Sequence, residues 1–120
     1  MNDKHQENVV TIVLKDLPKV SLNEWYAGGE HWSIRKKLKD NYYWLVKSQC
    51  KTVFPKTGKY FVKYHAEFKN NPLDASNFIG MVKMIEDILF ESDGYKIVEG
   101  IEITSRKGVS DKVTITVEEL

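Results

Sequence analysis

Four short stretches of the chain carry the residue patterns of β-strands. Residues 9–15, VVTIVLK, are short and rich in β-branched side chains, which predicts a buried strand. Residues 59–69 alternate between an apolar face with Tyr64 and Phe68 and a mixed face with Lys63, His65 and Glu67. Residues 95–105 and 112–120 also alternate, and the segment between them, RKGVSD, predicts that they form an antiparallel hairpin with a short loop.

Two longer stretches repeat apolar residues at helical spacing. The first runs from about Ser33 to Lys51 with lysine and arginine between its apolar residues, which predicts an amphipathic helix with a basic outer face. The second begins near Asp74, which follows Pro72 and is a good N-cap residue, and continues to about Phe90. Its predicted buried stripe is Phe78, Val82, Ile85 and Leu89. Its predicted opposite face is Ser76, Gly80, Lys83 and Asp87.

The order strand, helix, strand, helix, strand, strand predicts a single α+β domain with two helices packed on a mixed β-sheet. We expect this domain to span residues 9–120 and residues 1–8 to form a disordered tail, because MNDKHQEN is polar throughout. The segment VSLNEWYAGGEHW has no sustained period and contains Gly28 and Gly29, so it predicts a loop.

Cysteine content and hydropathy bear on the compartment. Cys50 is the only cysteine, which excludes a disulfide framework or a thiolate metal cluster within one chain. No apolar run is long enough to span a bilayer, and no segment has the pattern of a secretory signal. We therefore expect a soluble cytoplasmic protein that does not bind membranes.

Charge is distributed unevenly, although the formal net charge is only +1. From Arg35 to Lys69, ten lysine or arginine residues face two acidic ones, a local balance of +8. From Asn70 to the end the balance is −5. This asymmetry suits a protein that grips a polyanion on one surface and holds a cation on another, although solvated faces of helices and strands explain it equally well.

Five carboxylates near the ends of predicted elements are candidate ligands for Mg²⁺, which prefers oxygen donors. They are Asp74, Glu86, Asp87, Glu91 and Asp93. Each also has a structural explanation: a helix cap for Asp74, a pair with Lys83 for Asp87, and a turn before Gly94 for Asp93. Lys83 is open to two interpretations, because beside a metal it would neutralise a scissile phosphate, whereas facing solvent it is an ordinary surface cation.

The segments LDASN, FIGMVKMIEDILF and ESDGYKIV, taken together, resemble the core of the RusA-like Holliday-junction resolvases, an endonuclease family of phages and prophages. In that family an Asp-Leu-Asp-Asn segment opens a helix that carries a lysine, and an Asp-Asp pair follows it before a hairpin. Upstream, VSLNEWYAGGEHWSIRKKLKD resembles the family's Ser-x-Asn loop and the basic helix after it. The resemblance covers most of residues 20–117.

The resemblance implies roles for particular residues. Asp74 matches the first catalytic aspartate, Lys83 the helix lysine and Asp93 the late aspartate, with Asp74 and Asp93 as metal ligands. Ser76 stands where the family has the second aspartate of the opening pair, which removes one anionic ligand. Glu86 or Asp87 is a candidate replacement, and we rank Glu86 first because Asp87 already has Lys83 as a neighbour.

The resemblance further implies a homodimer that binds four-way DNA junctions and makes paired, symmetric nicks with Mg²⁺, or with Mn²⁺ in its place. Two sites related by a two-fold axis would match the approximate two-fold symmetry of a junction. If the chain is encoded by a phage or prophage, its location would be the cytoplasm of the bacterial host. The residues expected to contact DNA are Asn23, Arg35, Lys36, Lys37, Lys39, Lys47, Lys51 and Asn77.

A second hypothesis is a non-catalytic module that binds nucleic acid or protein and keeps the fold without the metal site, which Ser76 favours. A small-molecule enzyme has little support, because the chain has no glycine-rich phosphate loop and no nucleophile with an adjacent base. Among the aromatic residues, Trp25, Tyr26 and Trp32 are candidates for stacking on an unpaired base. Tyr42, Tyr43 and Trp44 are interpreted as core or dimer-contact residues.

Overall fold

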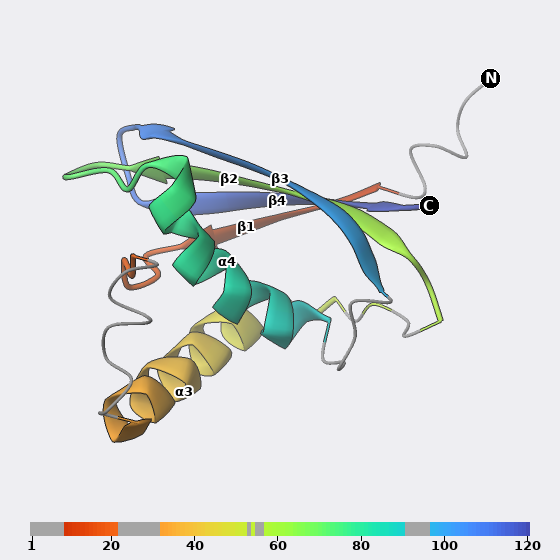
Figure 1. Cartoon of the computed structure of the whole chain (residues 1–120), viewed down its shortest axis with the longest axis horizontal. Helices are drawn as coiled ribbons and strands as arrows, with labels where there is room; N and C mark the ends of the chain where they lie inside the picture. The colour runs from red at the N-terminus through yellow and green to blue at the C-terminus, as the bar shows by residue number, and fades with distance from the viewer. Residues whose placement is uncertain (1–8, 22–31, 53, 55–56, 91–96) are drawn as a thin grey trace.

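The computed structural model describes residues 9–21, 32–52, 54, 57–90 and 97–120, with side chains from residue 35 onward in the first helix. Two helices and a four-stranded mixed sheet form one α+β unit, which confirms the predicted class and element order (Figure 1). In chain order the elements are β1 (Val9–Lys15), α3 (Trp32–Gln49), β2 (Tyr60–Phe68), α4 (Ala75–Leu89), β3 (Val98–Lys107) and β4 (Lys112–Glu119). The expected tail at residues 1–8 lies outside the described residues.

The sheet has the strand order β1-β4-β2-β3. Strand β4 is antiparallel to both β1 and β2, whereas β2 and β3 are parallel. The predicted hairpin of the last two strands is therefore wrong, because β2 lies between them. The connection from β3 to β4 passes over the end of β2, where the Gly108 amide donates to the Phe68 carbonyl at 2.9 Å and the Lys69 amide donates to Asp111 Oδ1 at 2.8 Å.

The failed hairpin has a physical reason. Alternation of apolar and polar residues fixes which side chains face the core, but it carries no information about which strand lies alongside. The short connection was compatible with a two-strand hairpin, and only the third strand, placed between the other two, decides against it. The alternation within β2 itself is confirmed, since Tyr60, Val62, Tyr64, Ala66 and Phe68 are all buried.

Both helices lie on one side of the sheet, and the core is the layer between the helices and the sheet (Figure 1). All four residues of the predicted stripe of α4 are buried. Gly80 is buried as well, so its assignment to the opposite face is wrong. Its neighbours Met81 and Met84 are buried too, because α4 packs against both the sheet and α3 and therefore buries a wider arc than one stripe.

Helix α3 is fixed by its own buried stripe and by the edge of the sheet. Tyr42, Val46 and Cys50 recur every four residues and are buried. The Tyr42 hydroxyl donates to the Pro18 carbonyl, and burial raises its pKa well above the ordinary value, so the proton is retained. At the C-terminal end of α3, the side chain of Gln49 accepts from the Lys15 amide at 2.6 Å and donates to the Lys15 carbonyl at 3.0 Å.

Neither α3 nor α4 combines the length and the apolar character that crossing a bilayer requires, and the same holds for the rest of the described chain.

Candidate acidic and nucleic-acid-binding residues

Asp74 lies on the surface at the point where α4 begins. Its Oδ1 accepts a hydrogen bond from the Asn77 amide at 2.8 Å, which makes Asp74 the N-cap of the helix, as the sequence predicts. Asp74 and Ser76 are exposed, and Asn77 is half-buried. The cap has a structural function of its own, because it satisfies one of the amides at the helix start that have no partner within the helix.

The loop before Asp74 is held by side chains from two other parts of the fold. Lys19 Nζ donates to the carbonyls of Asn70 and Asn71, both at 2.7 Å, and Asn71 has a positive φ of 45°. The Ser105 hydroxyl, on β3, donates to the Leu73 carbonyl. Asp74 therefore stands on a loop whose backbone is braced from both sides.

Glu86, three residues beyond Lys83, is in a different environment. It is half-buried, and its Oε1 accepts a hydrogen bond from the hydroxyl of Tyr64 at 2.9 Å. Burial raises the pKa of Glu86 above its ordinary value of 4.5 and Asp87 adds to the rise, whereas the Tyr64 hydrogen bond and Lys83 act in the opposite direction. Burial, followed by the charge of Glu86, raises the pKa of Tyr64 well above 10.0, so Tyr64 remains the donor.

The predicted acidic ligands therefore lie at opposite ends of α4. Asp74 precedes the helix and Glu86 lies in its last turn, so the two are about 18 Å apart along the axis at ~1.5 Å of rise per residue. Ligands of one Mg²⁺ ion each lie about 2.0–2.1 Å from it, which excludes a single ion shared by Asp74 with Glu86 or Asp87. Within the part of the chain that the structure describes, no three histidine, cysteine or acidic residues are grouped closely enough to hold a metal.

Three of the candidate ligands and DNA contacts, Asn23, Glu91 and Asp93, lie outside the described residues, as do the stacking candidates Trp25 and Tyr26. The described residues on either side of the Asp93 segment are Phe90, just after α4, and Ile97, whose carbonyl accepts from the Tyr60 amide at the start of β2. Asp74 lies at the opposite ends of these two elements, because it follows the C-terminal end of β2 and precedes the N-terminal end of α4.

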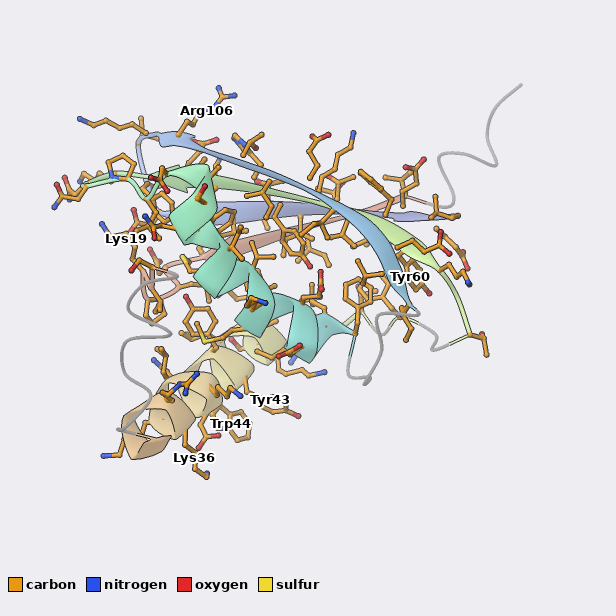
Figure 2. All side chains as sticks on the ribbon, in the orientation of Figure 1. Lys19, Lys36, Tyr43, Trp44, Tyr60 and Arg106 are labelled. Atoms are coloured by element: carbon orange, nitrogen blue, oxygen red, sulfur yellow. The ribbon has the colours of Figure 1, made fainter. Side chains whose placement is uncertain are left out.

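The predicted basic outer face of α3 is present. Lys36, Lys37, Lys39 and Lys51 are exposed, and Arg35 and Lys47 are partly exposed. Lys36 forms an ion pair with Asp40 one turn later at 3.1 Å, and Lys47 Nζ lies 5.7 Å from the centre of the Tyr43 ring. Lys83, on α4, is exposed. Apart from Lys51, which follows α3, and Lys83, these cations lie on the helix that packs beside α4, and Figure 2 labels Lys36 among them.

The three aromatic residues of α3 that were interpreted as core or dimer-contact residues divide into two groups. Tyr42 is buried and belongs to the core, whereas Tyr43 is 42% exposed and Trp44 is 70% exposed, so these two lie outside the core of the subunit. Their rings meet edge to face, with centres 5.6 Å apart and an interplanar angle of 87°. Helical geometry contains the signal, because Trp44 is two positions from both Tyr42 and Val46, which at about 100° per residue puts it on the opposite side.

A cavity of about 270 Å³ lies where α3 meets α4. The described residues that line it are Lys39, Asp40, Tyr43, Met84, Asp87 and Ile88. Met84 and Ile88 are buried and supply apolar surface, while the two carboxylates and the lysine are exposed. Asp87 therefore faces α3 and not the surface around Asp74.

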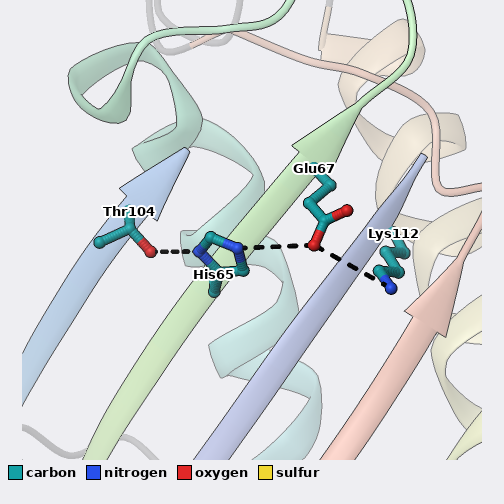
Figure 3. Close-up of polar contacts among 4 residues, drawn as sticks. All are labelled: His65, Glu67, Thr104 and Lys112. Carbon is teal, nitrogen blue, oxygen red and sulfur yellow. Dashed lines mark hydrogen bonds and ion pairs between the residues drawn. The ribbon is translucent and has the colours of Figure 1, made fainter. Parts of the chain in front are cut away.

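The sheet face that the helices leave uncovered carries a chain of polar contacts across β3, β2 and β4 (Figure 3). His65 Nδ1 and Thr104 Oγ1 are 2.5 Å apart, and His65 Nε2 is 3.7 Å from Glu67 Oε2. Glu67 Oε2 is also 4.0 Å from Lys112 Nζ. These side chains hold one another across neighbouring strands, which gives them a structural function in the sheet.

Comparisons with protein-family models, with curated protein sequences and with solved structures found no match to this chain.

Proposed function

We propose that the chain is a Mg²⁺-dependent, structure-selective endodeoxyribonuclease that cuts four-way DNA junctions as a homodimer, with Asp74 as a metal ligand. The observation that carries the proposal is the position of Asp74. It lies on the surface at the opening of α4 with Asn77 beside it, which is the arrangement that the resemblance to the RusA-like resolvases requires of its first catalytic aspartate. The bracing of the preceding loop by Lys19 and Ser105 supports it, because a metal ligand needs a fixed backbone.

The basic helix supports the DNA-binding part of the proposal. Exposed lysines on α3 are suited to contact phosphates without reading bases, which is what a protein that selects for DNA shape needs. A Mg²⁺ ion on Asp74 would polarise the scissile phosphate and lower the pKa of a bound water, which gives in-line hydrolysis. Exposed Lys83 is assigned an electrostatic role at that phosphate.

The remaining carboxylate ligand is assigned to Asp93, and the dimer matters for this assignment. Phe90, the last described residue before the segment that holds Asp93, is about 24 Å from Asp74 along α4 at ~1.5 Å per residue. A two-fold axis can bring different ends of two copies together. We therefore assign Asp74 of one subunit and Asp93 of the partner to one metal site.

The test is cleavage of a four-way junction with Mg²⁺ and with EDTA by the wild type and by Asp74→Asn. Asparagine also caps helices well, so the variant keeps the fold while it loses the anionic ligand. We expect Asp74→Asn to bind junctions as the wild type does and to cut them at least a hundredfold more slowly. Cleavage by Asp74→Asn at the wild-type rate, or equal cleavage in EDTA, would overturn the proposal.

A mixing experiment tests the shared site. Asp74→Asn and Asp93→Asn are each expected to be inactive, but a mixture of the two that has exchanged subunits contains heterodimers with one intact site. Random exchange gives about a quarter of the wild-type nicking rate if each site uses both subunits, and none if each site lies within one subunit. Absence of recovery, once exchange is verified with differently tagged subunits, would contradict the shared site while leaving the nuclease activity intact.

A non-catalytic DNA-binding module is the second candidate, and a specific observation favours it. Ser76 occupies the place of an acidic ligand, and no three histidine, cysteine or acidic residues of the described chain are grouped closely enough to hold a metal. Junction binding that weakens steeply with salt, with no Mg²⁺-dependent cleavage over a long incubation, would select this function.

A further inference from the structure

The cavity between α3 and α4 combines surfaces of different chemistry. The ring of Tyr43 forms one side, and Met84 and Ile88 on α4 supply apolar surface. The carboxylates of Asp40 and Asp87 and the ammonium group of Lys39 line it as well. At about 270 Å³ the cavity is just below the range of sites for drug-sized ligands, so it suits one planar ring system.

We propose that this cavity binds the base of an unpaired nucleotide, with the phosphates of the same strand on the lysines of α3. A cavity lined by an aromatic ring and apolar side chains is an environment in which proteins stack single bases. The exposed carboxylate of Asp87 lines the cavity and can accept a hydrogen bond from the amino group of cytosine, adenine or guanine. Its charge repels phosphate, so the base enters and the backbone stays outside.

The cations outside the cavity are placed to receive that backbone. Lys36 and Lys47 lie on the same side of α3 as Tyr43, because they are seven residues before it and four residues after it. Figure 2 shows Lys36, Tyr43 and Trp44 together along α3. Asp40, an acidic residue on this side, is paired with Lys36 at 3.1 Å. The surface around the cavity therefore matches an anionic strand.

Trp44 provides a place for a neighbouring base. The Tyr43 and Trp44 rings are at 87° to each other, so one planar base cannot stack on both. Trp44 is 70% exposed, and its ring packs against that of Tyr43, which restricts both side chains before any ligand binds. Two successive unpaired bases are thus accommodated, one in the cavity and the next on Trp44.

Charge also argues against a second copy of the chain as the occupant. A two-fold contact through this surface would place α3 against α3 and bring the lysines of both copies together. Like charges at close range oppose such a contact, whereas a nucleic acid strand neutralises them. The inference rests on the proposed DNA-binding function and adds to it that the protein holds unpaired nucleotides at a branch point.

The test uses a DNA junction with 2-aminopurine, a fluorescent adenine analogue that stacking quenches, at an unpaired position beside the branch. A fully paired duplex of the same length serves as the reference substrate. We expect Tyr43→Ala to weaken binding to the substrate with the unpaired nucleotide about tenfold, to abolish the quenching, and to leave duplex binding unchanged. Tyr43→Phe keeps the ring and is expected to bind as the wild type does.

Val109→Ala is the matched control, because Val109 is an apolar side chain that is 87% exposed and lies in the connection between β3 and β4. It should leave binding to both substrates unchanged. Equal binding of the unpaired substrate by Tyr43→Ala and the wild type would overturn the inference, as would loss of self-association in Tyr43→Ala during sedimentation. If the wild type binds neither substrate, the proposed function fails first, so the two failures are distinguishable.

Binding of free deoxyadenosine monophosphate tests whether the ligand is a strand or a mononucleotide. A strand adds phosphate contacts on the α3 lysines, so we expect it to bind at least a hundredfold more tightly than the mononucleotide, with a dependence on salt. Equal affinity for the two would contradict the assignment to a strand.

Discussion

The two ends of α4 use acidic side chains in different ways. At the N-terminal end, Asp74 is exposed, caps the helix through one oxygen and stands on a loop held by Lys19 and Ser105. At the C-terminal end, Glu86 is half-buried, accepts from Tyr64, and has a raised pKa. The comparison shows that residues which look equivalent as metal ligands in a sequence differ once burial and partners are known.

The difference can be tested through stability, and the Tyr64 contact gives the largest expected effect. Tyr64→Phe removes the hydroxyl and leaves the Glu86 carboxylate half-buried without that donor. We expect the free energy of unfolding to fall by about 1–2 kcal/mol at neutral pH, after allowance for the solvent that still reaches Glu86. Urea unfolding measures this change.

The double variant Tyr64→Phe with Glu86→Leu is the control for that experiment. Removing both polar partners leaves no unsatisfied group, so it should be more stable than Tyr64→Phe alone. The single variant Glu86→Leu completes the cycle. If the double variant is destabilised by the sum of the losses in Tyr64→Phe and Glu86→Leu, the hydrogen bond contributes nothing.

At the other end of the helix, the cap gives a smaller effect. Asp74→Ala removes the acceptor for the Asn77 amide, and we expect a loss of about 1 kcal/mol in the free energy of unfolding. Asp74→Asn should lower the free energy of unfolding by only a few tenths of a kcal/mol, since asparagine is an equally good N-cap residue. Equal losses in both variants would mean that charge, and not capping, accounts for the contribution of Asp74 to stability.

The smallest expected effect is a pH dependence. Because the pKa of Glu86 is raised in the folded protein, the folded state binds more protons than the unfolded state between the ordinary value of 4.5 and the raised one. The wild type therefore loses stability as pH rises through that window, and Glu86→Gln removes the loss. As pH rises from acidic to neutral, the free energy of unfolding of Glu86→Gln should increase relative to that of the wild type, by less than about 1 kcal/mol. A pH-independent difference would contradict the raised pKa.

Local pattern predicted most of the fold. Six elements, their order and the buried faces of β2 and α4 follow from periodicity and from the cap at Asp74. Strand neighbours did not follow, because alternation is the same for a strand in a hairpin and for a strand separated by β2. The burial of Gly80 was missed for a related reason, since one helix pattern does not show that a second helix packs alongside.

The candidate site was predictable only in part. The sequence identified Asp74 as the N-cap of α4, and helical spacing identified the basic face of α3. Spacing did not show that Glu86 is held by Tyr64, because that contact joins residues from β2 and α4. It also did not show that Asp87 faces a cavity beside α3, since this depends on how the two helices pack.

Mn²⁺ binding in the presence of an uncleavable junction, measured through the electron paramagnetic resonance of the free ion, tests whether Asp74 is a metal ligand. If the metal site is built on the N-terminal end of α4, Asp74→Asn loses Mn²⁺ binding, whereas Glu86→Gln and Asp87→Asn bind the ion as the wild type does. Loss of binding in Glu86→Gln or Asp87→Asn, with binding retained in Asp74→Asn, would contradict the account.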